Sequence, residues 1–102
     1  MAAEKRWDQA LSRAQKLVAV WPQSARPHFY LGNIYFATNR LNEAADEFTT
    51  VVRLMPRSIP GWQNLAICDE RLGRNEQTKA ALQQLLQLDP NNALAKSRLG
   101  AR

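Results

Sequence analysis

Apolar residues recur at helical spacing along most of the chain. His28, Leu31, Gly32 and Tyr35 fall at i, i+3, i+4 and i+7, which is the spacing of one helix face. Comparable faces lie before and after this one. Their members are Trp7, Ala10, Leu11, Ala14, Leu17 and Val18, then Ala44, Ala45, Phe48, Val51, Val52 and Leu54, then Leu82, Leu85, Leu86 and Leu88. The pattern predicts an all-α chain of amphipathic helices.

Signals that stop and start helices repeat at a fixed interval. Prolines recur with equal spacing, at Pro22, Pro56 and Pro90. Two positions after each lies a type that caps helix N-termini, namely Ser24, Ser58 and Asn92. Proline ends a helix because it lacks an N–H group, and the capping side chains accept hydrogen bonds from the next helix. Within each interval, Asn39-Arg40 and Gly73-Arg74 break the helical pattern.

The repeating unit resembles a known family. The first full unit reads His28-x2-Leu31-Gly32-x2-Tyr35, then Ala44-x3-Phe48, then Pro56. This is similar to the tetratricopeptide repeat, whose pattern is W-x2-L-G-x2-Y, A-x3-F and P with a period of about 34 residues. The second unit keeps Trp62, Leu65, Ala66, Leu82 and Pro90, and it departs from the pattern at Asp69 and Thr78.

The resemblance implies a right-handed superhelical solenoid of antiparallel helix pairs in one domain, residues 1–102. We expect residues 3–21 to be the second helix of a partial repeat. Two full repeats follow at 25–58 and 59–92, and 93–102 begins a further helix. Neither end resembles the polar cap that stacked repeats need. The chain is therefore either a segment of a longer array or a protein that self-associates through its unpaired terminal helices.

Gly32 interrupts an aromatic and apolar run, HFYLGNIYF. Glycine inside a helix costs about 1 kcal/mol relative to alanine. We therefore predict that Gly32, and Ala66 one period later, lie where the two helices of a unit approach most closely. Phe48 and Leu82 are predicted core residues.

Composition narrows the class of protein. The net charge is +5, but basic residues are interleaved with acidic ones, which favours a solvated basic surface over a nucleic-acid site. No apolar run is long enough for a membrane span, and the first residues lack a secretory core. We expect a cytoplasmic protein or a segment of a larger one. The single cysteine, Cys68, excludes an internal disulfide.

In the family that the chain resembles, the first helix of each unit lines a concave groove that binds ligands. The helix faces not needed for the core carry the candidate groove residues Arg26, Phe29, Tyr30, Asn33, Gln63, Asn64, Ile67, Arg71 and Arg98. Aromatic residues on such a face suit an interface. Phe29, Tyr30 and Phe36 would equally suit packing against a preceding repeat.

Some members of the family hold a peptide's terminal carboxylate with two Asn, two Lys and one Arg. Asn33, Asn64 and Arg98 match three of these positions, whereas the two Lys positions fall on Phe29 and Leu94. Because charge-assisted hydrogen bonds are the strong ones, losing two cations weakens such a clamp. The sequence therefore favours a groove for a mixed apolar and acidic peptide.

The sequence offers no catalytic constellation. Neighbouring acids such as Asp69 and Glu70 diverge around a helix, and one His with one Cys cannot form the usual zinc site. We expect His28 and Cys68 to be packing residues, with no cofactor, no metal, no small-molecule substrate and no enzyme activity. The preferred function is a scaffold that binds a protein or peptide. The alternatives are structural assembly and RNA binding, and the related RNA-reading repeats have a slightly longer period than this chain, which disfavours the latter.

Overall fold

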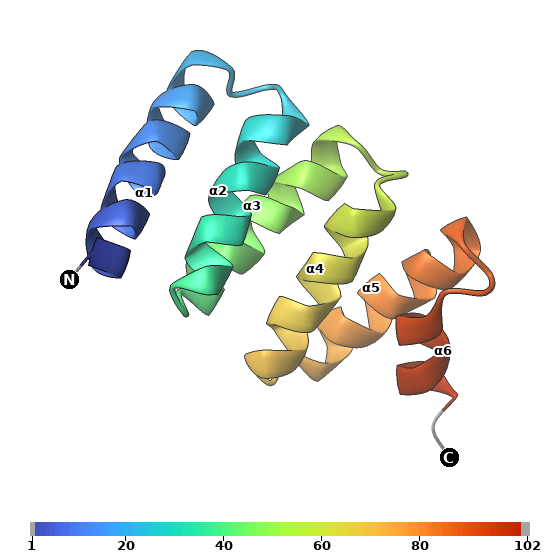
Figure 1. Cartoon of the computed structure of the whole chain (residues 1–102). Coiled ribbons are helices and arrows are strands. Elements are labelled where there is room, and N and C mark those ends of the chain that lie inside the picture. The colour runs from blue at the N-terminus through green and yellow to red at the C-terminus, as the bar shows by residue number, and fades with distance from the viewer. Residues whose placement is uncertain (1, 101–102) are drawn as a thin grey trace.

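The computed structural model describes residues 2–100, with side chains from Arg6 onward, and these residues form six α-helices and no strand. The helices are α1 (Ala2–Val20), α2 (Ala25–Ala37), α3 (Leu41–Leu54), α4 (Ile59–Arg71), α5 (Asn75–Leu88) and α6 (Ala93–Leu99). Each helix packs on the next one along the chain. Figure 1 shows the resulting stack, which runs from α1 on the left to α6 on the right. The predicted all-α helical-repeat solenoid is confirmed.

The described part of the chain is elongated, with extents of 43 × 30 × 20 Å. The last predicted segment, 93–102, begins with α6, and its residues 101–102 lie outside the described residues. None of the described helices is both long and apolar enough to span a membrane.

The predicted helix starts are correct in position, but only two of the three caps form a side-chain hydrogen bond. Ser58 Oγ accepts from the backbone N–H of Gly61 at 3.0 Å, and Asn92 Oδ1 accepts from that of Ala95 at 3.0 Å. Ser24 precedes α2 with extended backbone but makes no such bond, so its predicted capping role is wrong. The residue three positions after Ser24 is Pro27, which has no N–H group to donate.

Helices α2 and α4 end where the sequence predicts, and a residue with left-handed backbone stands two positions after the last helical residue of each. Asn39 has φ of 62° and Gly73 has φ of 74°, a conformation that asparagine and glycine tolerate best. These two turns reverse the chain so that α3 and α5 pack back on α2 and α4.

The close approach predicted at Gly32 is present. A Cβ atom at this position would lie 2.8 Å from Cε1 of Phe48, and Phe48 is fully buried at the centre of the α2–α3 core. One period later, Ala66 and Leu82 belong to one buried cluster between α4, α5 and α6. Both predicted core residues are therefore buried.

His28 performs the packing task that the repeat pattern gives to tryptophan. Its Nε2 donates to the backbone oxygen of Pro22 at 2.8 Å. Trp62, one period later, donates from its indole Nε1 to the backbone oxygen of Pro56 at 2.7 Å. Both rings place an N–H group against the turn before their own helix, so the substitution retains the hydrogen bond.

Asp69 departs from the repeat pattern but has a partner. The residue is 3% exposed, and its Oδ1 lies 3.4 Å from Nη1 of Arg74. Burial raises the pKa of the Asp69 carboxyl, and the charge and hydrogen bond of Arg74 oppose the increase. Arg74 also donates through Nη2 to Oδ1 of Asn42 at 2.8 Å, which ties the start of α5 to α3.

Candidate functional site

The candidate groove residues come from α2, α4 and α6, which Figure 1 shows in front of α3 and α5. They are placed by the helical period: residues on the core face of each helix pack on the following helix, and residues on the opposite face stay accessible. Arg26, Tyr30 and Asn33 are exposed on α2, as is Arg71 on α4. Gln63, Asn64 and Ile67 are half-buried on α4.

Two of the predicted residues contact each other across the α2–α4 boundary. Nδ2 of Asn64 donates to Oδ1 of Asn33 at 3.2 Å. Each amide keeps further hydrogen-bonding capacity, because an asparagine side chain offers two donors and two acceptor lone pairs. Tyr30, one turn before Asn33, leaves 38% of its surface exposed. These residues form the centre of the candidate site.

Arg98 lies at the α6 side of the candidate groove and is already paired. Its Nε donates to Oε2 of Glu70 on α4 at 2.7 Å, and both side chains remain substantially exposed. Sequence reasoning missed Glu70 as a member of this group, because the two residues are far apart along the chain and their spacing does not mark them as neighbours. The guanidinium that would grip a carboxylate therefore already faces one.

Phe29 is a core contact as much as a surface one. Its ring meets that of Phe48 edge-on, with ring centroids 5.6 Å apart. Phe29 is half-buried and also lines a crevice with Val51, Met55 and Pro60. The main packing partner of Phe29 is thus α3 of its own helix pair. The sequence had offered packing against a preceding repeat instead.

Two further candidates also have structural partners. The guanidinium of Arg71 stacks over the ring of Phe36, 4.8 Å from its centroid, which joins α4 to α2. Oε1 of Gln63 accepts from Nδ2 of Asn92 at 3.2 Å. Both contacts fix one helix pair on the next, so these two candidate residues also have a structural role.

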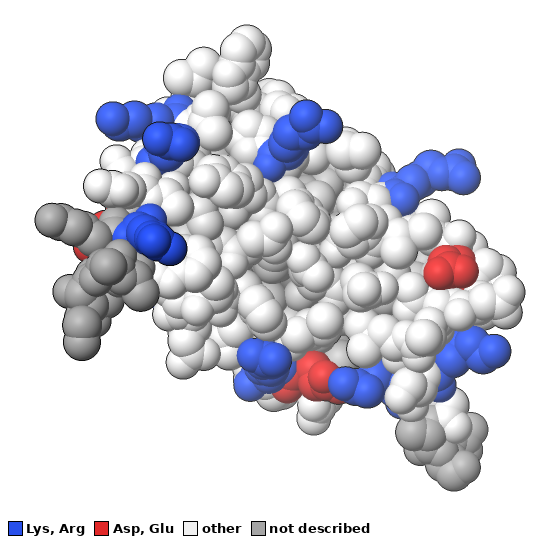
Figure 2. Space-filling model, viewed as in Figure 1, with Lys and Arg blue, Asp and Glu red and all other residues white. Residues whose placement is uncertain are grey.

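Charge is unevenly placed on the face that Figure 2 presents. The centre of this face is uncharged, and lysine and arginine side chains gather along its edges, with few acidic groups between them. The rim of this face is therefore mainly basic, and its centre is neutral.

Sequence reasoning also missed a crevice between α1 and α2. It has a volume of about 500 Å³ and is lined by Leu17, Trp21, Ser24, Arg26, Pro27 and Tyr30. Trp21 is 60% exposed. The repeat offered a signal for this crevice, since Leu17 and Trp21 stand one period before Val51 and Met55.

Cys68 lies outside the candidate site. It is fully buried, and burial, with the neighbouring Asp69 charge, raises its pKa to about 11. A thiol in this environment stays protonated at neutral pH. The expected packing role of Cys68 agrees with its place in the core cluster between α3 and α4.

Two family profiles match the chain. A family profile described as Tetratricopeptide repeat matches residues 1–67, and a second with the same description matches residues 62–92. No curated protein matches the chain as a whole-sequence relative.

Several solved structures share the fold. The first TPR of Spaghetti (RPAP3), bound to the HSP90 peptide SRMEEVD, has a TM-score of 0.84 and 19% identity, over 97% of this chain and 79% of that chain. MamA protein has a TM-score of 0.87 and 21% identity, over 98% of this chain and 55% of that chain. The Arabidopsis OM64 TPR domain has a TM-score of 0.81 and 16% identity, over 99% of this chain and 86% of that chain.

At these identities the structural matches establish the fold, and the sequence profiles establish the family. The first profile alone spans well over half of the chain. Together with the regular repeat of prolines and the close approach of Phe48 to Gly32, this shows that the chain belongs to the tetratricopeptide repeat family.

Proposed function

We propose that the chain is a protein-interaction module that binds an extended peptide segment in the groove of α2, α4 and α6. The observation that carries the proposal is the Asn64–Asn33 hydrogen bond, 3.2 Å long. It aligns two amides across neighbouring helices, with donors and acceptors left over for a peptide backbone. Exposed Tyr30 beside this pair supplies an aromatic anchor.

The groove fits an internal segment better than a chain terminus. Arg98 is paired with Glu70 at 2.7 Å, and apolar Phe29 and Leu94 stand where a carboxylate clamp would have cations. A ligand carboxylate would have to displace Glu70 and would gain only one cation. The net charge of +5 and the basic rim in Figure 2 favour acidic residues beside an apolar centre.

One structural neighbour gives context for this partner class. The structure of the first TPR of Spaghetti holds the HSP90 peptide SRMEEVD, which is acidic at three of its positions. That fact concerns a protein of 19% identity. We propose for this chain the same class of ligand, a short acidic peptide, but one recognised along its length and not at its end.

A peptide library synthesised with free and with amidated C-termini tests the proposal. We expect binding that is indifferent to amidation and is lost in Asn64→Ala, while the circular dichroism spectrum is unchanged. Asn91→Ala, an exposed asparagine in the turn before α6, is the matched control and should bind as the wild type does. Binding that requires the free carboxylate and Arg98 would replace the internal segment with a terminus. Equal binding by Asn64→Ala and wild type would refute the groove.

A further inference from the structure

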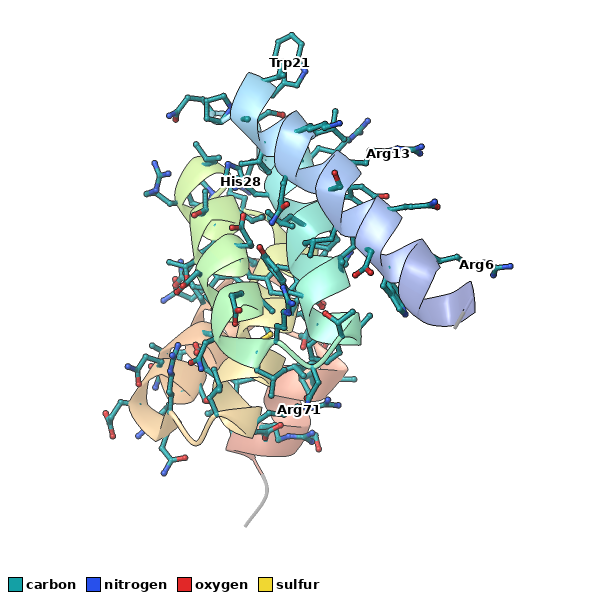
Figure 3. All side chains as sticks on the ribbon, turned by 90° about the vertical axis from the view of Figure 1, so that its left-hand side faces the viewer. Arg6, Arg13, Trp21, His28 and Arg71 are labelled. Carbon is teal, nitrogen blue, oxygen red and sulfur yellow. The ribbon has the colours of Figure 1, made fainter. Side chains whose placement is uncertain are left out.

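One long side of α1 is open to solvent and carries both apolar and basic side chains. Leu17 is 38% exposed, Val20 65% and Trp21 60%. Arg6, Arg13 and Val20 recur at equal intervals of about two helical turns, so they share a side of the helix. Figure 3 shows Arg6 and Arg13 projecting together from α1, away from the other helices, with Trp21 at the end of α1. We call this surface the open side of α1.

The contact between α2 and α3 shows how the equivalent surface is covered one period later. Val51 on α3 is the residue one period after Leu17, and it is only 2% exposed. It is buried between two helices: Gly61 of α4 lies against it on one side, and on the other α2 packs on α3, where Ala25 and Phe29 join the core cluster around Val51. Around α1, no described residue takes the place that α2 has on α3.

The two crevices at the ends of these helices show the same difference. The crevice beside Met55 is closed on one side by α2, through Ala25, Arg26 and Phe29. The crevice beside Trp21 has its walls from α1, α2 and the turn between them, and it is larger, about 500 Å³ against about 340 Å³. A helix lying on α1 as α2 lies on α3 would supply the missing wall.

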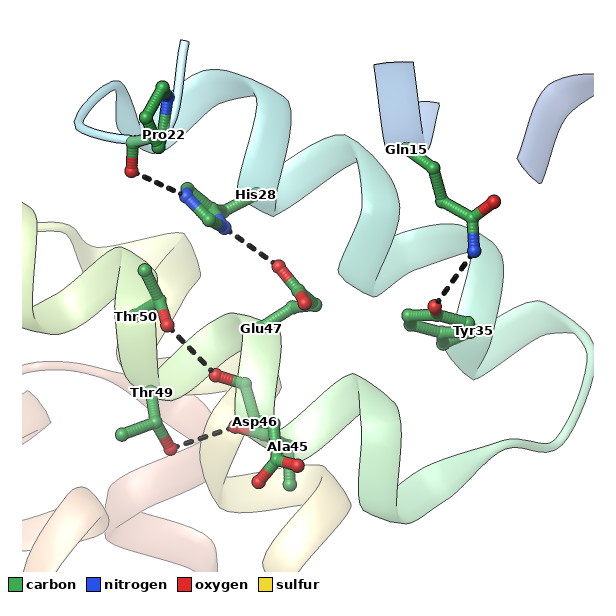
Figure 4. Close-up of polar contacts among 9 residues, drawn as sticks. All are labelled: Gln15, Pro22, His28, Tyr35, Ala45, Asp46, Glu47, Thr49 and Thr50. Atoms are coloured by element: carbon green, nitrogen blue, oxygen red, sulfur yellow. Dashed lines mark hydrogen bonds and ion pairs between the residues drawn. The ribbon is translucent and has the colours of Figure 1, made fainter. Parts of the chain in front are cut away.

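The α2–α3 contact also indicates the charge of a helix that would pack on α1. On the α2–α3 contact, Nδ1 of His28 lies 2.7 Å from Oε1 of Glu47, as Figure 4 shows. The residue one period before Glu47 is Arg13. Helix α1 therefore presents a cation where α3 presents an acid, and its complement is an acidic side chain in the place of His28.

The charges around Arg13 also favour an acidic side chain opposite it. The described side chains of α1 include the cations Arg6, Arg13 and Lys16, and one acid, Asp8. Asp8 lies on the side that faces α2, in a crevice shared with Arg40. Among the side chains that the structure describes, the open side thus has no acid to neutralise its cations.

A second copy of the chain fits this surface poorly. The helix at the other end of the stack is α6, which carries Lys96 and Arg98 and no acidic residue. Docking α6 on α1 would set cations against cations, which disfavours association. The charge pattern therefore favours an acidic helix over a second copy of the chain.

We propose that the open side of α1 binds an amphipathic helix of a partner protein, in the position that α2 takes on α3. The apolar stripe of that helix packs on Leu17, Val20 and Trp21, and an acidic side chain of the same helix faces Arg13. Its length is about that of α2, 13 residues. This surface adjoins the candidate groove at Tyr30, which lines the crevice beside Trp21, and it does not include Asn33 or Asn64.

The chain's own α2 segment supplies the probe. Peptides of residues 24–37 are made with His28→Glu and with His28→Lys, and each is titrated into the full chain by calorimetry and by NMR. We expect the Glu peptide to bind roughly fivefold more tightly than the Lys peptide, since an exposed charge pair contributes up to about 1 kcal/mol. The difference should shrink in high salt. NMR shift changes should centre on α1.

Matched variants assign the binding to this surface. Arg13→Glu should reverse the preference between the two peptides, whereas Arg53→Glu, the same charge change at an exposed position of α3, should preserve it. Val20→Asp should abolish binding, and circular dichroism checks its folding. Asn64→Ala should leave this binding intact even if the groove proposal fails.

Three outcomes would overturn the proposal: equal affinity for the Glu and Lys peptides, shift changes centred away from α1, or no binding up to the solubility limit of the Glu peptide. Light scattering tests whether a second copy of the chain occupies this surface. A mass that doubles with concentration in the wild type but not in Val20→Asp would assign the surface to a second copy of the chain instead.

Discussion

Replacing Gly32 with alanine places a methyl group against the ring of Phe48. The new Cβ would lie 2.8 Å from Cε1, 3.0 Å from Cζ and 3.1 Å from Cδ1 of that ring. The ring has little room to move, because Phe48 is fully buried and Phe29 packs edge-on against it at 5.6 Å. The substitution therefore forces α2 and α3 apart or displaces the ring.

Two opposing free energies set the size of the effect. Overpacking in a close-packed core costs about 1–3 kcal/mol, and replacing a helical glycine with alanine gains about 1 kcal/mol. We expect Gly32→Ala to lower the free energy of unfolding by roughly 0–2 kcal/mol. Gly32→Leu adds more volume at the same contact, so its loss should exceed about 3 kcal/mol.

Urea denaturation of the single variants and of a double mutant measures these changes in the free energy of unfolding. Phe48→Leu removes the ring atoms that meet the new methyl group. The Gly32→Ala/Phe48→Leu pair should therefore couple favourably, by at least about 0.5 kcal/mol relative to the sum of the singles. A Gly32→Ala variant that is more stable than wild type by the full helical gain, with no coupling to Phe48, would refute the close-approach argument.

Two further predictions follow from burial and capping. Burial and the Asp69 charge raise the pKa of Cys68 to about 11, so only about one thiol in a thousand is ionised in the folded protein at pH 8. Cys68 should therefore react with a thiol reagent far more slowly in the folded protein than in urea. Equal rates in the two states would contradict the burial of Cys68. Ser58→Ala removes the cap bond to Gly61 and should cost about 1 kcal/mol, whereas Ser24→Ala, opposite Pro27, should cost only a few tenths. Equal losses of unfolding free energy in the two variants would show that Ser24 caps α2 by another route.

Much of the fold follows from local features of the sequence. The prolines that end helices and the cap at Ser58 each act within one helix or turn, and Gly32 can be seen in the sequence as a glycine inside a helical pattern. Such features can be recognised along the chain because an α-helix has about 3.6 residues per turn wherever it occurs. Even the missing cap at Ser24 has a local cause, since Pro27 stands where the donor should be.

The candidate site depended on contacts that no local spacing contains. Spacing along the chain did not reveal that Arg98 would pair with Glu70, or that Phe29 would turn its ring onto Phe48. The Arg98–Glu70 contact depends on how one helix pair is rotated against the next, and the Phe29–Phe48 contact depends on how the two helices of one pair pack together.

The sequence by itself determined the helices, their period, their core faces and therefore the family of the protein. Only the tertiary structure decided which polar groups of the candidate groove already have partners, and that Leu17 and Trp21 border an open crevice. The physical reason is that the burial of a side chain depends on the helix that packs against it as well as on the side chain itself. Val51 and Leu17 occupy equivalent positions, yet Val51 is 2% exposed beneath α2, whereas Leu17 is 38% exposed because no described residue takes the corresponding place on α1.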